Sequence, residues 1–135
     1  QHLDAYNSER RKAARAYNAA FKDHPKITIP SGRKECDGIC STCDCHVFHQ
    51  YTLVLKDVDR NALVAHLNAN GIPCGVYYPI PLHLQKAYRD ERYNESDFKV
   101  TNQLVDEVIS LPMHTELDEE QIEFITKTVL DFIDS

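Results

Sequence analysis

The sequence of 135 residues lacks several features that define common classes of protein. No apolar run approaches the ~20 residues that a helix needs to cross a bilayer, which excludes a membrane-spanning protein. Only four glycines are present, and they are scattered, so no glycine-rich loop is available to bind a phosphate group. The seven histidines have no informative spacing to a nucleophile, and the sequence gives no basis for a Ser-His-Asp triad.

Positive charge is also scarce. The 21 acidic residues outnumber the 15 lysines and arginines, which gives a net charge of −6 and a pI of about 5.6. The basic residues gather in residues 1–34, mostly on the polar face of one expected helix. A nucleic-acid-binding surface needs a basic patch interleaved with aromatic residues and a high pI, so we expect no nucleic-acid partner. The five cysteines are an odd number, and no secretory segment is visible, which favours reduced thiols and a cytoplasmic location.

The hydrophobic patterns that are present alternate between helix and strand. Apolar residues spaced three, four or seven apart predict helices, and short runs rich in β-branched residues predict strands. The pattern favours a single domain of the α/β or α+β class, with a small sheet of about three or four strands packed against helices. The expected helices cover residues 3–21, a segment that starts at Asp57 or Asp59 and ends at 70, 82–88, a segment that starts at Ser96 or Asp97 and ends at 108, and 118–133. In the last of these, Asp118 can cap the start and Gln121 can bond back to it. The expected strands cover residues 26–30, 46–55, 72–77 and 109–111.

A cysteine-rich loop is the first candidate for chemistry. Cys36, Cys40, Cys43 and Cys45 precede His46, and four thiolates with an imidazole suit a tetrahedral zinc ion. Cys43 and Cys45 are, however, too close together to chelate one ion easily. A surface loop of reduced thiols is the preferred interpretation, with zinc binding and a Cys40–Cys43 redox pair as alternatives.

A stiff stretch further along the chain is the second candidate. Residues 71–83 (GIPCGVYYPIPLH) hold two glycines and three prolines around two adjacent tyrosines and a histidine. A backbone restricted in this way often presents side chains to a ligand. Residues 46–51 (HVFHQY) lie in the most strongly predicted strand, where alternation places His49 and Tyr51 on one face. The same alternation points Tyr77 and Tyr78 to opposite sides, so that one faces a pocket while the other packs.

Three motifs, at residues 46–51, 71–83 and 109–114 (ISLPMH), together resemble the closing third of the DegT/DnrJ/StrS family. These enzymes are pyridoxal-phosphate-dependent aminotransferases of nucleotide-activated keto sugars. The similarity also takes in residues 3–11 and 117–122, and therefore covers nearly the whole chain. The resemblance implies that residues 1–135 are the C-terminal small domain of a fold-type I aminotransferase, without its large cofactor-binding domain. The start of the chain, without an initiator methionine, is in keeping with a piece of a longer protein.

The resemblance also implies a role for part of the chain in substrate binding. In such a domain we expect His49, Tyr77, Tyr78 and His83 to form one wall of the cleft for the nucleotide-linked sugar, with Tyr51 behind them. Tyrosine and histidine suit this task because they stack on bases and sugars and donate single hydrogen bonds. Many relatives have His-Tyr-Pro where this chain has Tyr-Tyr-Pro, so one imidazole contact is replaced. His114, in the third motif, is expected only to close a turn.

The residues needed for transamination are absent from the sequence. Pyridoxal phosphate requires a Schiff-base lysine, an acid at its pyridine nitrogen and a phosphate-binding cup. No lysine here has a comparable setting, so we expect no catalytic residue and no bound cofactor in this chain. As the resemblance implies, the full-length enzyme would be a homodimer that uses pyridoxal phosphate and an amino-acid donor, glutamate in our interpretation. The alternatives are a stand-alone binding or interaction module and a regulatory member of the family.

Overall fold

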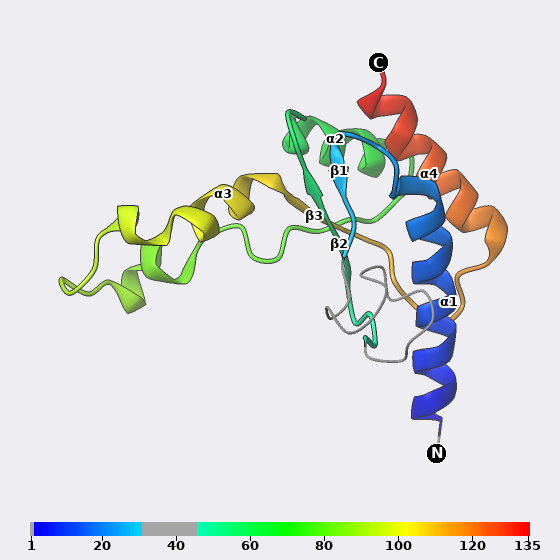
Figure 1. Cartoon of the computed structure of the whole chain (residues 1–135), viewed down its shortest axis with the longest axis horizontal. Coiled ribbons are helices and arrows are strands. Elements are labelled where there is room, and N and C mark those ends of the chain that lie inside the picture. Colours follow the sequence, from blue (N-terminus) through cyan, green and yellow to red (C-terminus); the bar gives the residue numbers. More distant parts are fainter. Residues whose placement is uncertain (1, 31–45) are drawn as a thin grey trace.

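The chain forms one small sheet covered by helices. A computed structural model describes residues 2–30 and 46–135. Over this part of the chain the three strands form an antiparallel sheet in the order β1-β2-β3, which confirms the predicted mixed α/β class (Figure 1). The helices are α1 (Leu3–Phe21), α2 (Arg60–Ala69), α3 (Lys99–Glu107) and α4 (Glu119–Ile133), and the strands are β1 (Ile27–Thr28), β2 (Tyr51–Leu55) and β3 (Val108–Leu111).

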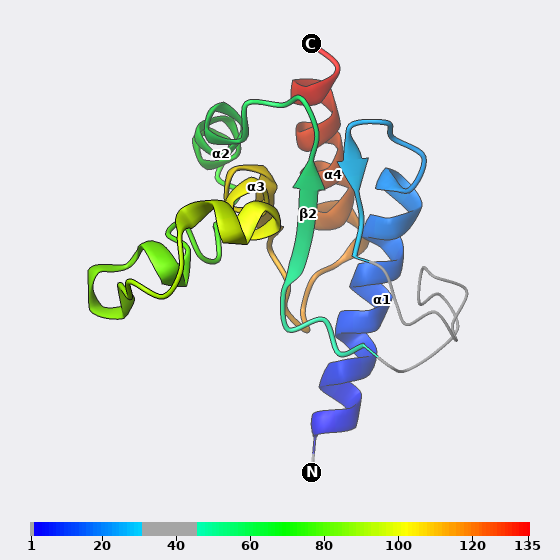
Figure 2. The same ribbon diagram turned by 60° about the vertical axis from the view of Figure 1, so that its left-hand side comes forward.

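The core lies between the sheet and two long helices. Strand β2 buries every second residue, and its partners on β3 place Tyr51 opposite Leu111 and Leu53 opposite Ile109. Helices α1 and α4 run side by side along the sheet (Figures 1 and 2), and each gives its apolar stripe to the core. The buried residues of these two helices include Ala13, Ala14, Tyr17, Phe21, Ile122, Ile125, Val129 and Ile133.

Several helix ends form as the sequence predicts. At the start of α4 the Asp118 carboxylate accepts a hydrogen bond from the Gln121 backbone N–H at 2.8 Å, and the Gln121 side chain accepts one from the Asp118 N–H at 3.2 Å. This reciprocal pair satisfies two amide groups that the helix cannot satisfy itself. Asp59 caps α2 by accepting from the Ala62 N–H, and Gly71, with φ of +74°, follows the end of α2 as a left-handed residue.

Two of the predicted strands are wrong in extent or in kind. The strand predicted over residues 46–55 begins only at Tyr51, because Phe48 has φ of +47° and interrupts the extended backbone. Residues 72–77 do not form a strand. The Ile72 N–H bonds instead to the carbonyl of Leu67 at the end of α2, and Pro73 has no N–H to donate, so only Gly75 pairs with the sheet, through Ser110.

A projecting arm, residues 80–98, leaves the body of the domain (Figures 1 and 2). It contains three 3₁₀ turns, Leu82–Leu84, Lys86–Tyr88 and Glu95–Phe98. The first two replace the single short helix predicted over residues 82–88, and the third lies at the start of the helix predicted over residues 96–108. The guanidinium of Arg92 donates to both carboxylate oxygens of Asp90 and holds the pKa of that carboxyl below its usual value. The arm leaves several large apolar side chains exposed.

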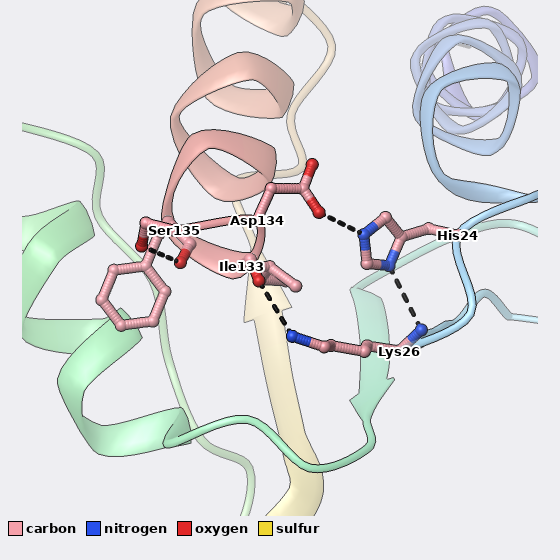
Figure 3. A network of polar contacts seen from close by, with 6 residues as sticks. His24, Lys26, Ile133, Asp134 and Ser135 are labelled. Atoms are coloured by element: carbon pink, nitrogen blue, oxygen red, sulfur yellow. Dashed lines mark hydrogen bonds and ion pairs between the residues drawn. The ribbon is translucent and has the colours of Figure 1, made fainter.

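The end of α4 is tied to the turn that follows α1 (Figure 3). His24 Nδ1 accepts from the Lys26 backbone N–H at 3.2 Å, so Nε2 carries the proton and donates to Asp134 at 3.1 Å. The Lys26 ammonium donates to the carbonyl of Ile133, one of the groups that a helix end leaves unsatisfied. The contacts to Asp134 and Ile133 join residues more than 100 positions apart in the sequence.

Two buried tyrosines join α1 to the sheet. The Tyr17 hydroxyl donates to the carbonyl of Pro112 at 3.0 Å, and the Tyr51 hydroxyl donates to Asn18 Oδ1 at 2.7 Å. The two rings lie 4.8 Å apart, and both side chains are fully buried. Helix α1 is therefore fixed both to β2 and to the segment that leaves β3.

No helix in the described residues is long and apolar enough to span a bilayer.

We expect Tyr17→Phe to lower the free energy of unfolding by about 1 kcal/mol, because the Pro112 carbonyl loses its donor while the ring still fills the core. Urea unfolding followed by circular dichroism measures this change. Tyr6→Phe is the matched control, since the Tyr6 side chain on the same helix is 49% exposed. An equal effect of the two substitutions would contradict the role given to the Tyr17 hydroxyl.

We also expect the chain to lose stability in alkali. Burial raises the pKa of Tyr17 above its ordinary value, and burial and the neighbouring Tyr17 raise the pKa of Tyr51. The unfolded chain ionises these tyrosines near pH ~10 and the folded chain only at higher pH. Their contribution to stability is therefore complete below pH ~10 and declines as the pH rises toward the folded-state values.

Urea unfolding at several pH values between about 8 and 11 tests this dependence. The double variant Tyr17→Phe/Tyr51→Phe should show a shallower decline than the unmodified chain. The double variant Tyr6→Phe/Tyr78→Phe, at two exposed positions, should keep the full slope. Identical slopes in the two double variants would show that the buried pair does not carry the effect.

Candidate functional site

Residues of all three sequence motifs line one open pocket of about 390 Å³. The first motif reaches it from the loop before β2, the second from the segment after α2, and the third from the end of β3. These segments are far apart in the sequence, and the sheet brings them together. The lining residues are His49, Gln50, Pro73, Cys74, Gly75, Tyr77, Ser110, Leu111, Pro112, Met113 and His114.

A short backbone bridge holds two walls of the pocket together. Ser110 N–H donates to the Gly75 carbonyl at 2.7 Å, and Gly75 N–H donates to the Ser110 carbonyl at 3.0 Å. The Ser110 hydroxyl also lies 2.8 Å from the Thr52 hydroxyl on β2. The segment that carries Tyr77 is thus anchored to β3 at one point.

The Tyr77 ring lies directly over Gly75. A Cβ atom at position 75 would sit 2.6 Å from Tyr77 Cζ, closer than real Cβ atoms approach another heavy atom. The absence of a side chain at position 75 therefore creates the space for the ring. Tyr77 is 52% exposed and also lines a second pocket of about 510 Å³, together with Tyr78 and Leu82.

His49 and Tyr51 do not share a face, so that prediction is wrong. His49 is exposed and lines the pocket, whereas Tyr51 is fully buried with its hydroxyl bonded to Asn18. The alternation fails because His49 precedes the strand. The turn there is local: His46 Nδ1 accepts from the Phe48 N–H at 2.9 Å, and Phe48 takes the left-handed conformation. Tyr51 therefore has no direct access to the pocket and lies behind its wall.

Tyr77 and Tyr78 also differ from the prediction that one packs while the other faces a pocket. Both side chains are more than half exposed, and both line the 510 Å³ pocket. The alternation expected of a strand does not apply because residues 76–79 are irregular. Of the two, only Tyr77 also reaches the 390 Å³ pocket.

His83 lies apart from the other predicted residues, on the arm. Its ring stacks on Phe98 with centroids 4.2 Å apart, and its Nε2 is buried with no hydrogen-bond partner among the described residues. It lines a separate pocket of about 770 Å³ with Arg89, Glu91 and Tyr93. The structure thus brings His49 and Tyr77 together and places Tyr78 and His83 elsewhere.

The structure adds pocket residues that the sequence analysis does not single out for binding. Cys74 is half-buried, and burial raises the pKa of its thiol, which favours a neutral thiol over a thiolate nucleophile. Gln50, Met113 and His114 lie on the same walls. The sequence feature that could have identified all four residues is their position within the three motifs.

The donors around the pocket suit binding better than covalent chemistry. Imidazoles, a phenol, a carboxamide and a thiol line it, and none of its described lining residues is a lysine, aspartate or glutamate. This set does not fit pyridoxal phosphate, which needs a lysine and an acid. No cluster of three or more potential metal ligands occurs among residues 2–30 and 46–135. The possible zinc ligands Cys36, Cys40, Cys43 and Cys45 lie outside the described residues.

Comparison with known proteins gives a consistent result. The sequence profile of the DegT/DnrJ/EryC1/StrS aminotransferase family matches residues 1–130. A Geobacillus stearothermophilus relative named "Pleiotropic regulatory protein" is 36% identical over 131 residues, covering 97% of this chain and 33% of that protein. The UDP-N-acetyl-3-dehydro-alpha-D-glucosamine 3-aminotransferase of Acidithiobacillus ferrooxidans is 37% identical over 130 residues, covering 95% of this chain and 31% of that protein.

Solved structures show the same fold. The crystal structure of Streptomyces venezuelae DesV superimposes with a TM-score of 0.84 at 28% identity, covering 99% of this chain and 33% of that protein. A family aminotransferase from Brucella abortus superimposes with a TM-score of 0.80 at 31% identity, covering 97% of this chain and 32% of that protein. The chain spans about a third of the length of the relatives that it matches.

We expect Gly75→Ala to displace the Tyr77 ring, because the added Cβ would overlap it. The change should remove the nuclear Overhauser contacts between the ring protons and residue 75 and shift the ring resonances. Gly71→Ala is the control: a Cβ there meets no atom within 4 Å, but the φ of +74° is unfavourable for alanine. It should lower stability by about 1 kcal/mol and leave the Tyr77 resonances in place. Unchanged Tyr77 contacts in Gly75→Ala would contradict the geometry described.

Proposed function

Because the chain belongs to the DegT/DnrJ/EryC1/StrS aminotransferase family, we propose that it is the C-terminal small domain of a pyridoxal-phosphate-dependent sugar aminotransferase. The full-length enzyme would transfer an amino group from glutamate to the keto carbon of a nucleotide-linked sugar. The observation that carries this proposal is the convergence of the three motifs on one pocket. Relatives named for UDP-linked and dTDP-linked sugars support the substrate class.

In this proposal the reaction chemistry belongs to a domain outside the chain. Pyridoxal phosphate supplies the electron sink for transamination, and its lysine would come from the large domain. The residues described here would bind and orient the sugar nucleotide. This division of roles agrees with a pocket whose described lining has no lysine and no carboxylate.

His49 and Tyr77 are the substrate-binding residues that the geometry supports best. Both side chains are exposed at the same pocket, and both can donate one hydrogen bond to a hydroxyl or phosphate oxygen. The Tyr77 ring also offers an aromatic face on which a sugar or base can stack. Tyr51 supports the wall from the core by fixing β2 to α1.

The arm is the part of the domain that we assign to the dimer contact. The arm and the helix that follows it expose a series of large apolar side chains, which are unfavourable in water unless a partner covers them. Tyr78 lies just before the arm and His83 lies on it, and both would reach the substrate of a neighbouring subunit. The exposed apolar residues are Ile80, Leu82, Leu84, Tyr88, Tyr93, Val100 and Leu104.

A regulatory role is the second candidate. Two relatives carry names of this kind, "Pleiotropic regulatory protein" and "Erythromycin biosynthesis sensory transduction protein EryC1". A stand-alone binding module is the third, and no metal site among the described residues supports it. Turnover of a keto sugar nucleotide by the gene product that carries this chain separates an enzyme from both.

We expect His49→Ala and Tyr77→Phe, in the full-length gene product, each to raise KM for the sugar nucleotide by roughly ten-fold, because each removes one hydrogen bond to the substrate. The absorbance spectrum of bound pyridoxal phosphate should not change. His66→Gln is the control, since His66 packs against Phe132 away from the pocket. Unchanged KM in both pocket variants would count against the assignment of this site.

A further inference from the structure

His114 occupies a position between two pockets. Its exposed side chain lines the 390 Å³ pocket, with His49 and Tyr77, and also an adjacent apolar pocket of about 210 Å³. The second pocket is formed mainly by the start of α4 and the residues before it, including Leu117 and Phe124. The imidazole therefore lies where a pocket of mixed polar and apolar lining meets a mainly apolar one.

The local backbone fixes the protonation pattern of the His114 ring. Its Nδ1 accepts a hydrogen bond from the Glu116 backbone N–H at 3.2 Å. A nitrogen that accepts an N–H bond carries no proton, so in the neutral ring the proton is on Nε2. His114 is therefore held as a hydrogen-bond donor at Nε2, and in this state Nε2 cannot act as a base.

The segment that carries His114 is anchored at both of its ends. On one side the Tyr17 hydroxyl holds the Pro112 carbonyl, and on the other the reciprocal bonds of Asp118 and Gln121 start α4. The segment between these anchors is short, which restrains its backbone, and the Nδ1 bond to the Glu116 N–H orients the ring. A donor that is fixed before a ligand arrives loses little entropy on binding.

We propose that His114 is a ligand-binding residue whose Nε2–H donates to an acceptor oxygen of the molecule in the 390 Å³ pocket. This deepens the proposed function and depends on it, because the acceptor would be a phosphate or hydroxyl oxygen of the sugar nucleotide. His114 would then have two roles, since it closes the turn through Nδ1 and binds through Nε2. The role predicted from the sequence, closing the turn, uses only the Nδ1 side of the ring.

Two substitutions separate these roles. His114→Asn keeps an acceptor near Nδ1, because the asparagine oxygen can bond the N–H two residues on, but it lacks a donor at the position of Nε2. His114→Gln places its amide N–H near the position of Nε2 and loses the local acceptor. A purely structural histidine would tolerate asparagine better than glutamine in every measurement. If His114 binds the ligand, His114→Gln should keep more ligand affinity than His114→Asn, while His114→Asn should still be the more stable variant.

The tautomer is tested first, on the 135-residue chain labelled with ¹⁵N. Long-range ¹H–¹⁵N spectra of the imidazoles should show the proton of neutral His114 on Nε2. A proton on Nδ1 would overturn the inference at once, because the ring would then have no donor at Nε2.

Affinity is tested next, in the full-length gene product, with UDP-N-acetylglucosamine and dTDP-glucose as probes in calorimetry. We expect His114→Asn to weaken binding of the tighter-binding probe by roughly ten-fold without changing the unfolding midpoint. We expect His114→Gln to retain most of the binding affinity but to lower the unfolding midpoint. If His49→Ala weakened probe binding but His114→Asn did not, this inference would be overturned and the proposed function would stand. If the unmodified protein bound neither probe, both would be overturned.

The source of the acceptor oxygen is settled by inorganic pyrophosphate as a competitor. An equal loss of pyrophosphate affinity in His114→Asn would place the contact at a phosphate, and a loss seen only with the sugar nucleotide would place it at a hydroxyl. Either result supports the donor role of His114.

Discussion

The buried contact between Tyr17 and Tyr51 is the constraint on which the rest of the structure depends. The two rings pack together at the centre of the domain, and each hydroxyl leaves the ring pair to bond a different segment. One bond reaches α1 and the other reaches the carbonyl that follows β3. A single aromatic pair therefore fixes the long helix, the central strand and the exit of the edge strand, and the pocket lies at the end of this arrangement.

The pocket has one wall that is held by several core contacts and another that is joined to the sheet through a single bridge. His114 and Pro112 stand on backbone that the tyrosine pair and the α4 cap hold in place. Tyr77 stands on a segment joined to the sheet through Gly75, with its ring resting on the glycine backbone. In the proposed function, the first wall would orient a ligand, and the second would supply an aromatic surface.

The helices could be predicted from the sequence more fully than the strands. The α4 start formed as expected because Asp118, Gln121 and their spacing act locally. The segment 72–77 could not be predicted correctly. Its conformation depends on the hydrogen bond from Ile72 to the Leu67 carbonyl and on the missing N–H of Pro73, and alternation of residue types carries no information about either. His49 and Tyr77 were identified through their motifs, whereas placing His114 beside them required the fold. The turn bond of His114 is local, but the pocket beside it is formed by residues from distant parts of the chain.

The attachment of residues 73–79 through one bridge has a consequence for how such a site can change. Within the described chain these residues share no continuous ladder with the sheet, so replacing them disturbs few of the bonds that keep the domain folded. Selection can then exchange pocket side chains at small cost in stability. A scaffold with such a replaceable wall can acquire new ligand specificities one residue at a time, while its core sequence remains under the constraint of packing.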